Sequence, residues 1–190
     1  MRVIAGSARG RQLATFAGRD IRPTPDRVRE ALFSILYSRN GPPAGCKVLD
    51  LYAGSGALGI EALSRGAAHA WFVDSSRQAL ATIRENLERC KFTARATTLM
   101  RDVHEALPTL VGLGPFDLIF ADPPYGRELA PRLLEGLAGW SLLAPGGVFC
   151  LETAAADPVP PQTGSLQRYD QRQYGLTMLH FFHQASEAQG

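Results

Sequence analysis

The sequence predicts a doubly wound, Rossmann-like α/β fold built on a seven-stranded sheet. Short apolar runs alternate along the chain with stretches of helical periodicity. Most of these runs are nearly continuous in apolar residues, which is typical of parallel strands covered by helices on both faces. The last two runs follow each other with no helix between them, so we expect them to close the sheet as a pair. We expect one domain over residues 1–190, with a basic extension at 1–40 and a core at 44–190.

The individual elements follow from this alternation. We expect strands at residues 46–52, 70–74, 96–100, 116–121, 148–152, 166–169 and 176–182. We expect the core helices at residues 57–65, 76–90, 103–111 and 129–143. The turn Pro145-Gly146-Gly147 leads into the fifth strand.

The first 40 residues read as a small hairpin followed by a helix. Residues 2–5 and 12–16 flank a basic tip at residues 6–10. Thr24 suits the helix N-cap and Pro25 the first helical position. Arg27 and Arg29 lie off the apolar stripe of this helix, so we expect them on its polar side.

Charge is concentrated at the N-terminal end. The formal net charge of the chain is +2, but residues 1–40 carry eight arginines against three acids, which leaves the remainder negative. This distribution favours a nucleic-acid partner, with Arg9, Arg11, Arg27 and Arg29 as the candidate RNA contacts. Because arginine outnumbers lysine 18 to 2 in the whole chain, a merely solvated basic face is the alternative.

Composition excludes several classes of protein. The chain is 45% hydrophobic and 20% charged, as in ordinary globular domains. The three cysteines are far apart and form no Cys-x-x-Cys pair, so we expect a reduced, cytoplasmic protein with no metal. The N-terminus lacks a signal-peptide pattern, and no segment is apolar enough for a membrane span.

A glycine-rich turn follows the first core strand. Gly54 and Gly56 let the backbone approach a ligand closely, and Ala53 and Ser55 complete the turn between Asp50 and the next helix. Two further acids end the next two strands. Asp74 is placed to accept from ribose hydroxyls, and Asp102 from an adenine amino group.

Two cofactors fit this turn. Gly54-x-Gly56-x-x-Gly59 with Asp74 satisfies the dinucleotide fingerprint, so an NAD-dependent oxidoreductase is one reading. Asp50 would repel a pyrophosphate but attract an ammonium or sulfonium group, and no hydride-transfer acid or base is evident. The row of acids at the strand ends matches S-adenosylmethionine, which carries adenine, ribose, a sulfonium and an ammonium. These acids are Asp50, Asp74, Asp102 and Asp122.

The segment Asp122-Pro123-Pro124-Tyr125 stands where the fourth strand should surface. The exocyclic amine of a nucleobase is a poor nucleophile and needs acceptors for its N–H bonds. Asp122 and the Pro123 carbonyl can accept these two N–H groups, and the Tyr125 ring can stack on the base. Two prolines stiffen the turn and remove two backbone donors. The alternative is a strand that simply ends in a Pro-Pro turn.

These motifs together resemble the RsmD family of 16S ribosomal RNA (guanine-N2) methyltransferases, within the DPPY-type amino methyltransferases. The resemblance rests on residues 2–6, 9–11, 22–24, 26–33, 49–59 and 61–67. It implies a class I methyltransferase sheet with S-adenosylmethionine as cofactor. It also implies methyl transfer to the N2 amine of a guanine, guanine 966. The implied partner is ribosomal RNA of the small subunit within an assembly particle. It also implies that Arg22 and Thr24 border the cofactor pocket. The match is weak beyond Glu152.

Other functions share parts of this pattern. A DNA amino methyltransferase would use the same amine clamp, Asp122-Pro123-Pro124-Tyr125, although the chain offers no separate DNA-recognition domain. A non-enzymatic RNA-binding domain would require the clamp and the acidic row to be accidental. The NAD-dependent oxidoreductase remains the third alternative.

Overall fold

The computed structural model describes residues 1–15, 25–124 and 129–185. Its described strands form one sheet of eight, in the order β3-β2-β1-β4-β5-β8-β7-β6. The strands are β1 Lys47–Leu51, β2 His69–Asp74, β3 Ala96–Met100, β4 Phe116–Ala121, β5 Leu143–Ala154, β6 Gln162–Thr163, β7 Leu166–Tyr174 and β8 Thr177–Gln184. The first five are parallel, and β8, β7 and β6 follow antiparallel.

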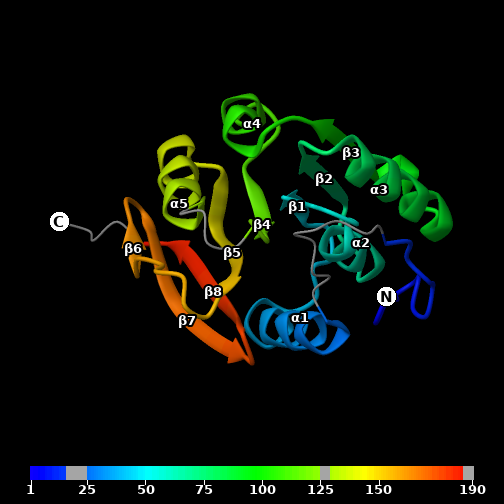
Figure 1. Cartoon of the computed structure of the whole chain (residues 1–190), viewed down its shortest axis with the longest axis horizontal. Coiled ribbons are helices and arrows are strands. Elements are labelled where there is room, and N and C mark those ends of the chain that lie inside the picture. Colours follow the sequence, from blue (N-terminus) through cyan, green and yellow to red (C-terminus); the bar gives the residue numbers. More distant parts are fainter. Residues whose placement is uncertain (16–24, 125–128, 186–190) are drawn as a thin grey trace.

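The helices cover both faces of this sheet, as the sequence predicts. They are α1 Asp26–Asn40, α2 Ala57–Ser64, α3 Arg77–Cys90, α4 Val103–Leu110 and α5 Leu129–Trp140, with a short 3-10 turn η1 at Thr93–Arg95. In Figure 1, α4 and α5 lie on one side of the sheet, and α1 and α2 lie on the other. The chain order reverses between β1 and β4, which is the switch point where open α/β sheets bind ligands.

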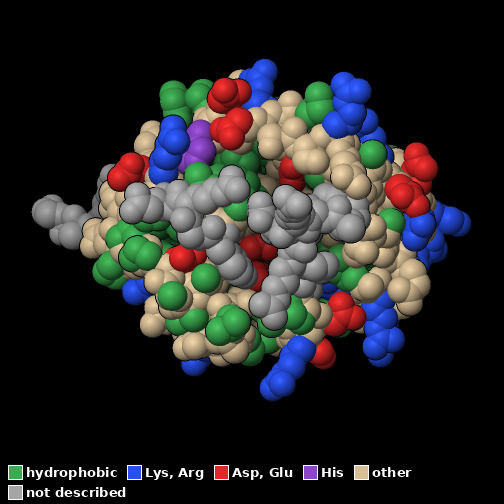
Figure 2. Space-filling view, in the orientation of Figure 1, with side chains coloured by type: hydrophobic (Ala, Val, Ile, Leu, Met, Phe, Trp, Pro, Cys, Tyr) green, Lys and Arg blue, Asp and Glu red, His purple; other side chains and the backbone are tan. Residues whose placement is uncertain are grey.

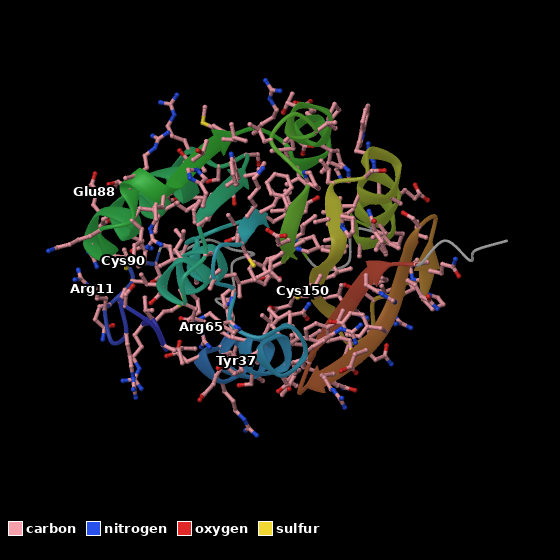
Figure 3. All side chains as sticks on the ribbon, turned by 180° about the vertical axis from the view of Figure 1, so that it is seen from behind. Arg11, Tyr37, Arg65, Glu88, Cys90 and Cys150 are labelled. Carbon is pink, nitrogen blue, oxygen red and sulfur yellow. The ribbon has the colours of Figure 1, made fainter. Side chains whose placement is uncertain are left out.

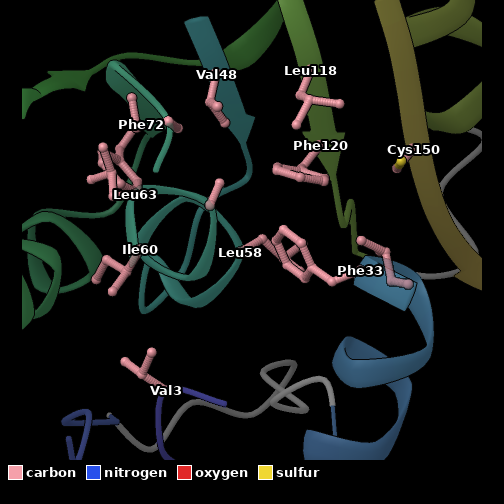
Figure 4. Close-up of a cluster of buried hydrophobic side chains, with 14 of the residues drawn as sticks. Val3, Phe33, Val48, Leu58, Ile60, Leu63, Phe72, Leu118, Phe120 and Cys150 are labelled. Carbon is pink, nitrogen blue, oxygen red and sulfur yellow. The ribbon is translucent and has the colours of Figure 1, made fainter. Parts of the chain in front are cut away.

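Two buried clusters hold these layers together. Side chains of α1, α2 and α3 pack on one face of the sheet, where the Phe33 ring lies 5.7 Å from that of Phe120 (Figure 4). Side chains of α4 and α5 pack on the opposite face, around Ile119 and Leu151. Alternate residues of β4 face opposite clusters, as expected for a strand buried on both sides.

Residues 1–15, called the N-terminal arm below, are docked against α2 and α3. Val3, Ala8 and Leu13 are buried in the first cluster. The buried Glu61 carboxylate accepts from Ile4 N at 2.8 Å and from Ala5 N at 3.0 Å. The arm and α2 each contain part of the sequence that carries the family resemblance, and these hydrogen bonds hold the two segments together.

Several local predictions need correction. The predicted hairpin is present as one antiparallel bridge, Arg2 to Gln12, without two extended strands. Pro25 is the N-cap of α1, one residue before the helix, because its ψ of 144° is extended. The predicted cap, Thr24, lies outside the described residues.

The sheet also differs in detail. It has one strand more than predicted, the two-residue β6 at its edge. The expected turn at Pro145 lies within β5, where the pairing with β4 is irregular between Phe116 and Leu118. Helix α5 ends at Trp140 instead of residue 143.

Candidate functional site

Strand register brings the predicted acids to one edge of the sheet. Leu51 of β1 pairs with Val73 of β2 and with Ala121 of β4. Asp74 and Asp122 therefore follow at the same level on either side of β1, where the glycine-rich loop begins. Figure 2 shows acidic side chains in a recess near the centre of the face seen in Figure 1. The prediction that Asp74 and Asp122 share the carboxyl edge with this loop is confirmed by the register.

The glycine-rich loop, residues 52–56, needs an unusual backbone. Gly54 and Gly56 have φ of 55° and 75°, in the left-handed region that glycine enters without penalty. A Cβ at Gly59 would lie 2.4 Å from the Phe72 ring, so the third glycine allows α2 to pack closely on β2. The loop thus turns tightly and α2 begins directly behind it.

Asp50 lies inside the sheet, one residue before the strand end. Its carboxylate is 3% exposed and accepts a 2.9 Å hydrogen bond from Gly59 N. Burial raises its pKa to about 8, against the smaller opposing effect of the Gly59 hydrogen bond. Burial thus favours the protonated carboxyl over the charged form. Its observed contact holds the start of α2, and its predicted role toward a cofactor cation stays a prediction.

Asp74 binds the backbone of the glycine-rich loop at Gly54. Its Oδ2 accepts from Gly54 N at 2.9 Å and its Oδ1 from Ser76 N at 2.8 Å. Each carboxylate oxygen has a second lone pair, and the side chain is half-buried, so hydroxyl donors can still reach it. Asp102 is the exposed N-cap of α4 and accepts from His104 N at 2.8 Å.

The clamp follows directly after β4, which ends at Ala121. Asp122 is half-buried and Pro123 is buried directly after Ala121. Asp122 continues the strand face of Phe120, which packs against α1. Tyr125, Arg22 and Thr24 lie outside the described residues, so their predicted roles stay predictions.

Sequence reasoning missed three polar residues at this edge. Asn86 of α3 is fully buried and binds both the arm and the loop residue Ser55. Tyr52, with φ of 53°, places its hydroxyl 3.3 Å from His104 Nε2, and burial raises its pKa to about 12. Glu152 is 3% exposed and follows Leu151, which pairs with Ala121, so it lies level with Asp122. Only the strand-end position of Glu152 could have been noticed in the sequence.

The candidate RNA-binding arginines fall into two groups. Arg9, Arg11 and Arg27 are exposed. Arg11 donates to the Arg89 carbonyl at the end of α3, and Figure 3 shows it beside Glu88 and Cys90.

Arg29 is fully buried, so its predicted place on the polar side of α1 is wrong. Its guanidinium donates to Asp26 at 3.1 Å and to the Arg2 carbonyl, which ties α1 to the arm. Burial lowers its pKa, while Asp26 acts in the opposite direction. A long side chain with these partners is held inside the protein, so Arg29 is a structural residue.

Other features lie away from this edge. A pocket of about 170 Å³ lies at the opposite end of β4, between Tyr37, Pro43, Asp117 and Gly147, and no predicted site residue lines it. Within residues 1–15, 25–124 and 129–185, no group of three or more His, Cys, Asp or Glu side chains is arranged to hold a metal ion. No described helix is long and apolar enough to cross a membrane.

Comparison with known proteins gives consistent matches. A family model described as "Conserved hypothetical protein 95" matches residues 1–183. YlbH of Bacillus subtilis is 38% identical over 93% of this chain and 95% of its own length. "Ribosomal RNA small subunit methyltransferase D" of Escherichia coli K12 is 35% identical over 88% of this chain and 83% of its own. The solved structure of yhhF from Escherichia coli, 29% identical, covers 98% of this chain and 99% of its own with a TM-score of 0.84.

Proposed function

Because the chain belongs to the RsmD family, whose model is described as "Conserved hypothetical protein 95", we propose that it is an S-adenosylmethionine-dependent methyltransferase of small-subunit ribosomal RNA. The acceptor in this proposal is the N2 amine of a guanine, guanine 966 of 16S RNA, in an assembly particle in the cytoplasm. The relative from Escherichia coli is named for small-subunit ribosomal RNA methylation. The nucleotide itself rests on family resemblance.

One observation carries the proposal. The glycine-rich loop leaves β1 and the clamp leaves β4, and these neighbouring strands end at the same register pair, Leu51 to Ala121. Adjacent strands are about 4.8 Å apart. A ligand on the loop and an amine held by Asp122 would therefore meet between the two strand ends. Proximity of this kind is the main source of rate enhancement for a direct group transfer.

The loop fits S-adenosylmethionine better than a dinucleotide. A pyrophosphate needs several free N–H donors, but Gly54 N is bonded to the Asp74 carboxylate and Gly56 N to the Ala53 carbonyl at 2.7 Å. A negative carboxylate at the loop also repels phosphate. Hydroxyl and ammonium groups, by contrast, find acceptors in Asp74 and in the loop carbonyls. The oxidoreductase reading is therefore disfavoured.

The residues of this chain would act by holding the acceptor amine. When bound, S-adenosylmethionine supplies an electrophilic methyl group on a sulfonium. Asp122 and the Pro123 carbonyl accept the two N–H groups of the amine and orient its lone pair. As positive charge grows on that nitrogen, the Asp122 carboxylate stabilises it and can take the proton that leaves. Tyr125 would stack on a base that is already out of its RNA stack.

Replacing Asp122 by Ala tests this role. The variant should lose at least about a hundredfold in single-turnover methylation, while its affinity for S-adenosylhomocysteine changes little. Asp117→Ala is the matched control, because Asp117 is a carboxylate at the other end of the same strand that accepts from Lys47 N at 2.7 Å. The control should lower thermal stability and leave turnover intact. Near-normal turnover of a folded Asp122→Ala protein would refute the clamp.

A further inference from the structure

The N-terminal arm and the glycine-rich loop share one buried side chain, Asn86 of α3. Its Nδ2 donates to the carbonyl of Ser55 in the loop at 3.0 Å and to the carbonyl of Ala14 in the arm at 3.0 Å. Its Oδ1 accepts from Ala14 N at 2.7 Å. The amide is fully buried, so both of its N–H bonds and its oxygen are used inside the protein.

No direct hydrogen bond from Asp74 or Asp50 reaches Ser55 among the described contacts, since these two acids hold Gly54 and Gly59. Asn86 therefore holds the carbonyl of the Ser55–Gly56 peptide, whose N–H bonds to the Ala53 carbonyl at 2.7 Å, between two glycines with positive φ. Glycines of this kind have wide conformational freedom, so loss of the Asn86 bond would leave this peptide held only through its N–H.

The far end of the arm is fixed separately on α2. Ser64 accepts from Ser7 N through its carbonyl at 2.8 Å and from Ala8 N through its hydroxyl at 2.9 Å. In the described part of the chain, the side-chain hydroxyl of Ser64 bonds to the arm and not to the loop. The arm is thus anchored at two places. Asn86 binds both the arm and the loop, whereas Ser64 binds the arm.

We propose that Asn86 is a positioning residue that couples docking of the N-terminal arm to the conformation of the cofactor loop. Loosening the arm weakens the Ala14 bonds, frees the Asn86 amide to rotate and releases the Ser55 carbonyl. Coupling between sites is reciprocal, so a bound cofactor also tightens the arm. This coupling rests on the proposed function only for the identity of the ligand, S-adenosylmethionine, that binds the loop.

A double-mutant cycle tests the coupling. Asn86→Ala should weaken S-adenosylhomocysteine binding, measured by calorimetry, about tenfold, as expected for loss of a buried hydrogen bond to a binding loop. Ser64→Ala should weaken it about two- to threefold through the arm. In the Asn86→Ala background, the Ser64 substitution should have no further effect on affinity, because the link is already cut, although it still lowers the melting temperature.

One control and one alternative variant separate coupling from general loss of stability. Asp117→Ala removes a side-chain acceptor at the opposite edge and should lower the melting temperature without changing ligand affinity. If Asn86→Ala does not fold, Asn86→Asp keeps the size of the side chain and an acceptor for Ala14 N but loses the donors to Ser55 and Ala14. It should show the same loss of affinity.

The coupling is overturned if folded Asn86 variants bind S-adenosylhomocysteine as the natural protein does, or if the two substitutions lower affinity independently. Failure of the proposed function looks different. In that case the natural protein itself does not bind S-adenosylhomocysteine. Hydrogen exchange then tests the coupling between arm and loop without a ligand. Amides of residues 52–56 and of the arm should exchange faster together in Asn86→Ala, and unchanged loop exchange would contradict the coupling.

Discussion

Two glycines of the N-terminal arm offer a matched test of how the arm docks. Gly6 and Gly10 have nearly the same backbone, with φ of 83° and 82°. A Cβ on Gly6 would lie 1.9 Å from the Ser64 carbonyl oxygen, whereas a Cβ on Gly10 would meet nothing within 4 Å. Substitution by Ala therefore gives equal backbone strain at both positions and a steric clash at only one.

The expected magnitudes follow from these distances. Forcing Ala into the left-handed region costs about 1 kcal/mol at either site. At Gly6 the arm must also move away from Ser64, which disrupts the bonds from Ser7 N and Ala8 N. Two such bonds and the repacking add about 3 kcal/mol. For a chain of this size, 1 kcal/mol shifts the melting temperature by roughly 2–4 °C.

Thermal unfolding followed by circular dichroism measures the difference. Gly10→Ala should lower the melting temperature by about 2–4 °C and Gly6→Ala by about 8–16 °C. Hydrogen exchange of arm amides should rise sharply only in Gly6→Ala. Equal shifts for the two variants would mean that the arm is not packed on Ser64 as described.

The remaining predictions concern the acids, the aromatic ring and the arginines. Asp50 has a folded pKa of about 8 against an ordinary 3.8, so the folded state keeps a proton that the unfolded state loses, and stability should fall as pH rises across that interval. Asp50→Asn should therefore gain melting temperature relative to the natural protein between pH 5 and pH 8.5, and parallel curves would contradict the raised pKa. Tyr125→Phe should retain most single-turnover activity and Tyr125→Ala should lose it, since stacking needs only the ring; equal losses would implicate the hydroxyl. Arg9→Gln should reduce the salt dependence of RNA binding by about 0.7–0.9 in log-log slope. Arg172→Gln, whose arginine pairs with Asp170 on β7, serves as its control, and equal slopes for the two variants would remove Arg9 from the interface.

Most of the core could be predicted because parallel strands buried on both faces have a strong apolar signal. Two strands, Ala96–Met100 and Phe116–Ala121, begin and end where the sequence predicts. The edge strand β6 has two residues and no such signal. The irregular start of β5 contains Pro145, which the sequence rules assign to a turn.

The site was less predictable, because its supporting contacts join distant parts of the chain. Asn86 binds residues 72 and 31 positions away, and an Asn within an amphipathic helix gives no indication of this. Arg29 was placed by its charge, although Asp26 and the Arg2 carbonyl stabilise it inside the protein. The raised pKa of Asp50 depends on its depth within the sheet, which a linear pattern does not reveal.

We propose that this chain transfers a methyl group to a guanine N2 amine of small-subunit ribosomal RNA. The most direct measurement combines the purified protein, S-adenosylmethionine and small-subunit particles from a strain that lacks the gene. Mass spectrometry of the digested 16S RNA should show one new N2-methylguanosine at position 966, absent with Asp122→Ala. A methylated adenine or cytosine, or no transfer to particles or RNA by the folded natural protein, would contradict the account.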